Sequence, residues 1–137
     1  MRRVLVVDSD PRVCQAIHKT LLVISCTVFF AFDAVTAITE ARRHNPDLII
    51  VDLSLPAGSG LLVVERLRAL SAFVRTPMIV IAERGARLEA DRVLNAGANA
   101  FLPKPLNLQV LLSQVATLLA PDEHHVVWRE SVQVLLK

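Results

Sequence analysis

Five short, uninterrupted apolar runs constrain this chain more than any other feature of its sequence. Each run lacks the alternation of apolar and polar side chains that is typical of a half-exposed strand. Continuous runs of this length instead indicate parallel strands that are covered on both faces. The expected strands are Val4–Val7, Val28–Phe32, Leu48–Val51, Met78–Ile81 and Ala100–Leu102.

Segments with apolar residues at helical spacing alternate with these runs. Asp10-Pro11 marks one helix start, and Asn95-Ala96-Gly97 marks a helix end. Five strand–helix units of this size predict an α/β fold. We expect a doubly wound, five-stranded parallel sheet with five helices on its two faces, in the flavodoxin-like strand order 2-1-3-4-5.

The composition narrows the function classes. Fifteen Lys and Arg against thirteen Asp and Glu give a net charge of +2, too balanced for a nucleic-acid groove, so this domain is not expected to bind nucleic acid directly. The longest uncharged run, Thr20–Phe32, is shorter than the roughly 20 residues of a membrane helix. The first acidic residue comes too early for a secretory signal. We therefore expect a cytoplasmic protein without membrane contact.

Cys14 and Cys26 have no metal-binding or redox spacing and indicate buried, reduced thiols.

The last part of the chain differs in character. Residues 1–120 are expected to form the domain, and residues 121–137 a linker with a C-terminal extension, one interpretation being the start of an effector region. Val126–Lys137 fits a helix or a strand, and periodicity leaves both open. His124 and His125 have no Cys or carboxylate framework nearby, which favours a solvated linker over a metal site.

Charged residues follow three of the predicted strands. Asp8 ends the first strand, Asp52 the third, and Lys104 follows the fifth. Ligands of open α/β sheets bind beyond the carboxyl ends of the strands, where the strand order reverses, so the three side chains should meet. Alone, each has an ordinary explanation as a cap or a solvated charge. Together, they predict a site for a divalent cation and a phosphoryl group.

Several stretches resemble one family along residues 2 to about 120. The chain is similar to the receiver domain of bacterial two-component response regulators. The stretches that carry the resemblance are Val4–Asp8, Pro46–Pro56, Gly60 and Ala96–Pro105.

The resemblance implies a role for each site residue. Asp52 would accept a phosphoryl group from a sensor histidine kinase or a phosphotransfer protein. Asp8, Asp52 and the backbone carbonyl of Ser54 would hold Mg²⁺. Lys104 would contact the phosphoryl group, with a cis peptide bond to Pro105. These roles describe a regulatory phosphoacceptor rather than an enzyme.

Two positions depart from the family pattern. Ser9 stands where receivers usually have a second acid, so the pocket has two carboxylates rather than three, and we expect weak Mg²⁺ binding. Ile81 stands where the family has Thr or Ser at the end of the fourth strand. Without that hydroxyl, the usual link from the phosphoryl group to the aromatic switch residue, Phe101, is missing.

Asp10 could replace the lost acid, but its place before Pro11 favours a helix N-cap. Asp8-Ser9-Asp10 also resembles the nucleophile motif of haloacid-dehalogenase-type phosphatases. Arg12 stands where that motif needs Thr or Val, and the chain has no room for a cap domain. The segment between the first strand and helix has no glycine, which argues against dinucleotide binding.

The sequence therefore leaves two hypotheses. In the first, Asp52 is phosphorylated with a weakened dependence on Mg²⁺ and an uncoupled switch. In the second, the chain is a pseudo-receiver that acts through protein contacts without phosphate. The expected partner surface is the fourth helix, fifth strand and fifth helix, where Val110 lies outside the core stripe and is consistent with a homodimer.

Overall fold

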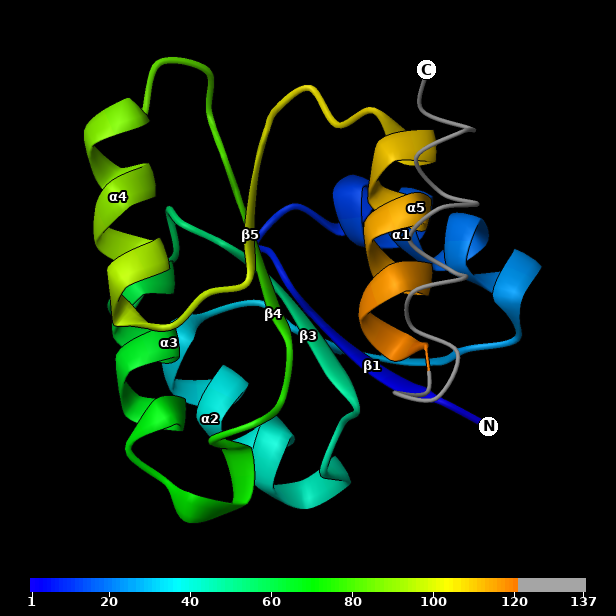
Figure 1. The fold of residues 1–137 in the computed structure, drawn as a ribbon, viewed down its shortest axis with the longest axis horizontal. Coiled ribbons are helices and arrows are strands. Elements are labelled where there is room, and N and C mark those ends of the chain that lie inside the picture. Colours follow the sequence, from blue (N-terminus) through cyan, green and yellow to red (C-terminus); the bar gives the residue numbers. More distant parts are fainter. Residues whose placement is uncertain (121–137) are drawn as a thin grey trace.

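The computed structural model of the protein describes residues 1–120. Five parallel strands form one sheet in the order β2-β1-β3-β4-β5, as predicted (Figure 1). The bounds are β1 (Arg3–Val7), β2 (Thr27–Ala31), β3 (Leu48–Asp52), β4 (Met78–Ala82) and β5 (Ala100–Pro103). Each predicted run is found within one residue of its predicted ends.

Five helices cover the sheet, with α1 and α5 on one face and α2, α3 and α4 on the other (Figure 1). Their bounds are α1 (Pro11–Leu21), α2 (Ala34–His44), α3 (Gly60–Arg68), α4 (Arg87–Ala96) and α5 (Leu108–Leu119). Two short 3-10 turns, Leu22–Ile24 and Ser71–Phe73, follow α1 and α3. The doubly wound architecture predicted from the sequence is therefore confirmed.

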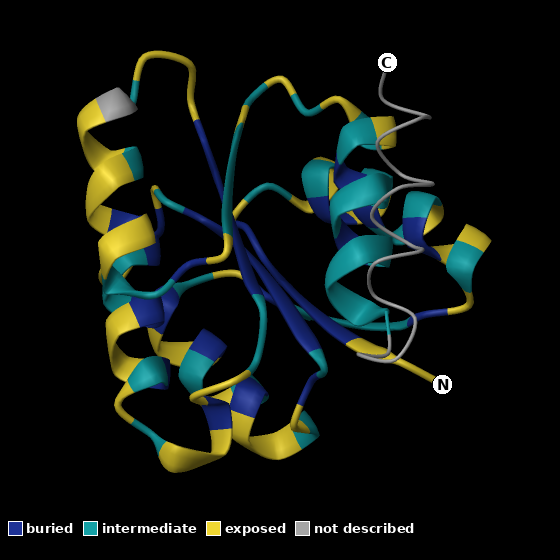
Figure 2. Cartoon of the chain, viewed as in Figure 1, coloured by how far each residue is buried: buried dark blue, intermediate teal, exposed yellow. Residues whose placement is uncertain are grey.

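The three central strands lie between the helix layers (Figure 2). Every residue of β3 and β4 is buried, as are the last four residues of β1. Alternate residues of one strand belong to different clusters: Ile49 packs beneath α2 and α3, and Ile50 beneath α1 and α5. Because both faces are covered, the runs stay apolar without alternation.

Local signals set the element boundaries. Ser25 adopts a left-handed conformation (φ 58°), which ends the turn after α1 just before β2 begins. Phe32, expected in the second strand, instead follows β2 and is 48% exposed. Cys14 and Cys26 are buried free thiols, as predicted. Polar side chains cap four helices at their N-termini: Asp10, Asp33, Ser59 and Asn107.

Arg68 connects α3 to the end of α4. Its guanidinium donates two hydrogen bonds to the carbonyl oxygen of Gly97, one to that of Phe73, and one to Asn99 Oδ1. Gly97 has φ 119°, and a Cβ there would lie 2.9 Å from Arg68 Nε. Gly97 therefore serves both the left-handed helix end and the close approach of Arg68. At the other end of α4, Ala86 supplies no side-chain cap.

None of the helices within residues 1–120 has the length and apolar character that crossing a bilayer requires. The expected linker at residues 122–125, the paired histidines and the segment Val126–Lys137 lie outside the described residues.

Candidate functional site

The strand order brings Asp8 and Asp52 together. β1 and β3 are neighbours, Val7 pairs with Val51, and each aspartate is the next residue along the chain. Asp8 is 1% exposed and Asp52 is 5% exposed, and they are the only buried charged residues among those of residues 1–120 whose burial is described. Buried carboxylates are rare unless they are paired or bind a cation, so this pair marks the candidate site.

Lys104 completes the group predicted from the strand ends. Its Nζ lies 3.0 Å from Asp8 Oδ2 and 3.2 Å from Asp52 Oδ2. The backbone N–H of Lys104 donates to the carbonyl oxygen of Ala82 at 2.7 Å, which fixes the lysine beside the end of β4. The peptide bond to Pro105 is cis, as the resemblance implied. Three strands thus deliver two carboxylates and one ammonium to a single point.

The backbone holds Asp8 firmly. Its Oδ1 accepts the N–H of Asp10 at 2.8 Å, and its own N–H donates to the carbonyl oxygen of Ala31 at 3.1 Å. The Cys14 thiol donates to the carbonyl oxygen of Asp8 at 3.5 Å. Burial, with the nearby Asp8 charge, raises the pKa of Cys14 to about 11, so this thiol is neutral and structural.

The charges of the site perturb one another. Burial raises the pKa of Asp52 above its ordinary value, and the negative charge of Asp8 adds to the shift. Burial opposes the charge on Lys104, but the close contact with Asp8 and the charge of Asp52 raise the pKa of Lys104 overall. With both carboxylates and the lysine ionised, the site is left with one net negative charge, which favours a further cation.

The raised pKa of Asp52 predicts a pH-dependent effect of Asp52→Asn on stability. The folded chain binds the proton of the Asp52 carboxyl more tightly than the unfolded chain does. The free energy of unfolding therefore falls as pH rises from about the ordinary pKa of 3.8 through the higher pKa of the folded state. Asp52→Asn removes the buried charge, while Lys104 keeps Asp8 as its partner. The variant should melt a few degrees above the wild type at pH 7, with the gap narrowing as pH falls. Thermal denaturation followed by circular dichroism between pH 4 and 8 tests this; a less stable variant at pH 7 would contradict it.

The donors present fit a divalent cation of the Mg²⁺ type. Asp8 Oδ2 is buried and has no hydrogen bond of good geometry within residues 1–120, although Lys104 Nζ is close to it. Asp52 supplies a second carboxylate. The carbonyl oxygen of Ser54 receives no hydrogen bond from the described backbone. Hard oxygen donors suit Mg²⁺, and no described cluster of three acids, histidines or cysteines strengthens the set.

Ser9 and Asp10 do not add a carboxylate to this set. Ser9 is exposed at the turn between β1 and α1. Asp10 is the N-cap of α1, as predicted: its Oδ1 accepts the N–H of Arg12 at 2.9 Å. The Arg12 guanidinium also donates a hydrogen bond to each carboxylate oxygen of Asp10 at 3.2 Å, a contact that the sequence did not predict.

The Thr or Ser of the family is expected at the end of the fourth strand, and in the structure that end is Ala82 rather than Ile81. β4 ends at Ala82, one residue later than predicted. Ile81 packs into the cluster beneath α1 and α5, whereas Phe101 packs against the opposite cluster. Ala82 pairs with Pro103, two residues beyond Phe101, so these residues share a face of the sheet. Neither Ile81 nor Ala82 carries a hydroxyl, so a hydrogen-bond donor is missing at either position.

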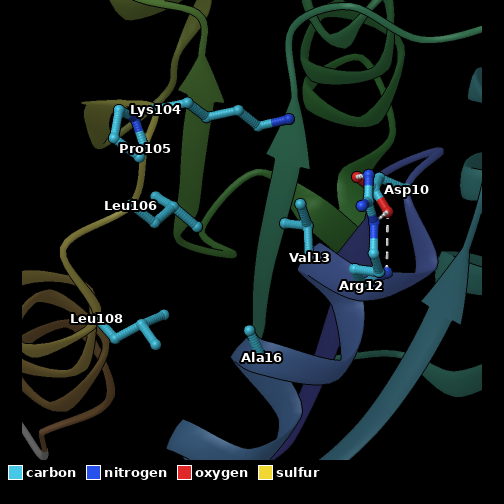
Figure 3. Close-up of a pocket in the computed structure, with 8 residues that line it drawn as sticks. All are labelled: Asp10, Arg12, Val13, Ala16, Lys104, Pro105, Leu106 and Leu108. Carbon is cyan, nitrogen blue, oxygen red and sulfur yellow. Dashed lines mark hydrogen bonds and ion pairs between the residues drawn. The ribbon is translucent and has the colours of Figure 1, made fainter.

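A pocket of about 380 Å³ opens beside the site, between the start of α1 and the loop that leads to α5 (Figure 3). Lys104 extends into the space between the two elements, and Asp10 and Arg12 lie across from it (Figure 3). The remaining lining is apolar: Val13, Ala16, Pro105, Leu106 and Leu108. The pocket thus combines an apolar lining with the charged groups of Asp10, Arg12 and Lys104.

Comparison with known proteins agrees with this geometry. A family model described as the response regulator receiver domain matches residues 4–116. The chain is 34% identical to response regulator MprA of Mycobacterium sp. (strain KMS) over 124 residues, which are 88% of this chain and 53% of that protein. It is 32% identical to transcriptional regulatory protein KdpE of Mycobacterium tuberculosis (strain H37Rv) over 84% of this chain and 50% of the relative.

Solved structures have the same fold. The chemotaxis response regulator CheY4 of Vibrio cholerae superimposes with a TM-score of 0.80 at 27% identity, covering 86% of this chain and 98% of that one. The chain spans about half the length of the curated relatives it matches.

Proposed function

Since the chain belongs to the response regulator receiver domain family, we propose that Asp52 accepts a phosphoryl group from a phosphohistidine of a sensor kinase or phosphotransfer protein. One observation carries the proposal: two buried carboxylates from neighbouring strands meet a single lysine at 3.0 and 3.2 Å. Charged residues are seldom fully buried, and these lie at the carboxyl edge of a parallel sheet, where ligands of this architecture bind.

The proposed transfer uses Asp52 as the nucleophile. A carboxylate oxygen of Asp52 forms a bond to phosphorus, the phosphorus–nitrogen bond of the phosphohistidine breaks, and the imidazole leaves with the electron pair. Lys104 then exchanges its ion pair with Asp52 for contact with a phosphoryl oxygen, where its charge offsets the added negative charge. Asp8, Asp52 and the Ser54 carbonyl would hold Mg²⁺, which supplies further positive charge toward the phosphoryl oxygens. With Ser9 in place of an acid, we propose that this binding is weak.

The pocket beside Lys104 supports docking of the phosphoryl donor. Its apolar lining comes from α1 and from the loop before α5, and it opens at the same edge of the sheet as Asp52. A helix of the donor protein seated there would bring a phosphohistidine toward the buried carboxylates. We propose this pocket as the docking surface for the kinase or phosphotransfer partner.

Incubation of the protein with acetyl phosphate tests the proposal. With Mg²⁺, intact-mass spectrometry should show the addition of a single phosphoryl group, and chelation of the metal should strongly reduce the adduct. No adduct at millimolar Mg²⁺ would reject phosphoryl acceptance.

A second candidate function is a phosphorylation-independent interaction module. It is favoured by Ser9 in the metal pocket and by the missing hydroxyl at the end of β4. In this version Asp8, Asp52 and Lys104 form a buried structural group of two carboxylates and one ammonium, and the signal passes through protein contacts alone. Failure of the acetyl phosphate experiment would favour this candidate.

We also retain the proposal that α4, β5 and α5 form a homodimer face. Leu88 of α4 is 82% exposed and Leu94 is 42% exposed, so the helix presents apolar surface to solvent. A chain that sediments as a monomer at all concentrations, with and without acetyl phosphate, would contradict this part of the proposal.

A further inference from the structure

The contact between Asp10 and Arg12 lies beside the pocket and has no part in the proposed phosphoryl transfer. Asp10 Oδ1 accepts the backbone N–H of Arg12 at 2.9 Å and its Nε–H at 3.2 Å, and Oδ2 accepts from Nη2 at 3.2 Å (Figure 3). Within residues 1–120, every hydrogen bond to the Asp10 side chain therefore comes from Arg12. The guanidinium engages both carboxylate oxygens, the geometry in which arginine binds a carboxylate best.

Asp10 is close to the metal donors along the chain and in space. Its backbone N–H donates to Asp8 Oδ1 at 2.8 Å, so the two residues are joined directly. It lines the same pocket as Lys104. The Asp10 carboxylate therefore lies next to the residues that would hold the cation, and Arg12 is its ion-pair partner.

We propose that Arg12 is a positioning residue that neutralises Asp10 and holds its carboxylate on the helix cap, which lowers the affinity of the pocket for divalent cations. The inference rests on the proposed function, because the cation concerned is the one held by Asp8, Asp52 and the Ser54 carbonyl. Ser9 leaves the pocket one acid short, and Asp10 is the next acid along the chain. Mg²⁺ keeps several water ligands in proteins, so a carboxylate released at the rim adds affinity through those waters.

The chain allows a clean test of this role. In Arg12→Gln the backbone N–H of residue 12 still donates to Asp10 Oδ1, so the cap of α1 is kept while Oδ2 is released. The Arg12 side chain is 90% exposed, and exposed ion pairs contribute little to stability, so the variant should fold. In Asp10→Asn the cap is also kept, since Asn is as good an N-cap residue as Asp. The two changes and their combination form a double-mutant cycle.

Isothermal titration calorimetry with MgCl₂ on the full chain should give about two- to fivefold tighter binding for Arg12→Gln than for the wild type. The gain should vanish in the combined Asp10→Asn and Arg12→Gln variant. Arg12→Lys keeps the positive charge but loses the planar guanidinium that binds both carboxylate oxygens. Its Mg²⁺ affinity should therefore lie between those of the wild type and Arg12→Gln. Arg42→Gln, the same charge change at an exposed residue near the end of α2, is the control and should leave the affinity unchanged.

Three results would overturn the inference. Equal Mg²⁺ affinity of wild type and Arg12→Gln would show that the contact has no influence on the pocket. A gain that persists with Asn at position 10 would assign the effect to the charge of Arg12 alone. No Mg²⁺ binding by either protein would reject the proposed metal site as well. The first two results, in contrast, reject only the role of Arg12.

Discussion

Asp52→Asn is expected to abolish the phosphoryl adduct that forms with acetyl phosphate. The amide oxygen of asparagine is a poor nucleophile, and no other described carboxylate has the same relation to Lys104 except Asp8. Asp8 is less available, because its Oδ1 accepts the N–H of Asp10 and the residue is 1% exposed, against 5% for Asp52. Intact-mass spectrometry over a time course of acetyl phosphate and Mg²⁺ measures the loss, which should be complete within detection.

Asp47→Asn is the matched control for this experiment. Asp47 is a partly buried acid just before β3, at the opposite end from Asp52, and its Oδ2 accepts the N–H of Arg3 at 2.8 Å. This variant should form the adduct at the wild-type rate. A full adduct in Asp52→Asn would place the acceptor elsewhere, and peptide mapping would identify the residue.

Ser9→Asp is expected to raise Mg²⁺ affinity by about tenfold, equivalent to ~1.4 kcal/mol. The substitution adds a third carboxylate beside Asp8, and hard dications gain most from added oxygen charge. Ser9 is exposed, so the larger side chain meets no packing obstacle in the free protein. Mg²⁺ titration by calorimetry gives the affinity, and the rate of adduct formation at low Mg²⁺ should rise with it.

Ser9→Asn separates charge from size in this prediction. Asparagine has almost the shape of aspartate but brings a neutral oxygen, so its Mg²⁺ affinity should stay near the wild-type value. If Ser9→Asp and Ser9→Asn bind Mg²⁺ equally, the account of position 9 as a missing acid is wrong.

The fold could be predicted because its physical determinants are local and repeated. Each strand is buried on both faces, so each appears as an unbroken apolar run, and each helix shows one apolar stripe. The meeting of Asp8, Asp52 and Lys104 followed from the same reasoning, since the carboxyl ends of parallel strands lie at one edge of the sheet.

Two features of the site could not be predicted in this way. A run that is apolar on both faces gives no alternation, so the sequence does not indicate which face each residue of β4 meets. A shift of one residue at the strand end exchanges the faces, and β4 extends to Ala82, which is on the same face as Phe101, whereas Ile81 is on the other. The hydrogen bonds from the Arg12 guanidinium to Asp10 depend on the rotamer of an exposed side chain, and sequence periodicity does not predict rotamers.

The hydrogen bonds of Arg68 restrain the C-terminal end of α4. At the C-terminal end of α4, Arg68 holds the Gly97 carbonyl from a different helix. At its N-terminal end, Ala86 provides no cap, and Leu88 stands 82% exposed. A rotation about the C-terminal end keeps the bonds of Arg68, whereas a translation of the whole helix breaks them. The N-terminal end of α4 follows β4, at the edge of the sheet that holds Asp52, so the end of α4 on the side of the carboxylates is the end that no side chain caps.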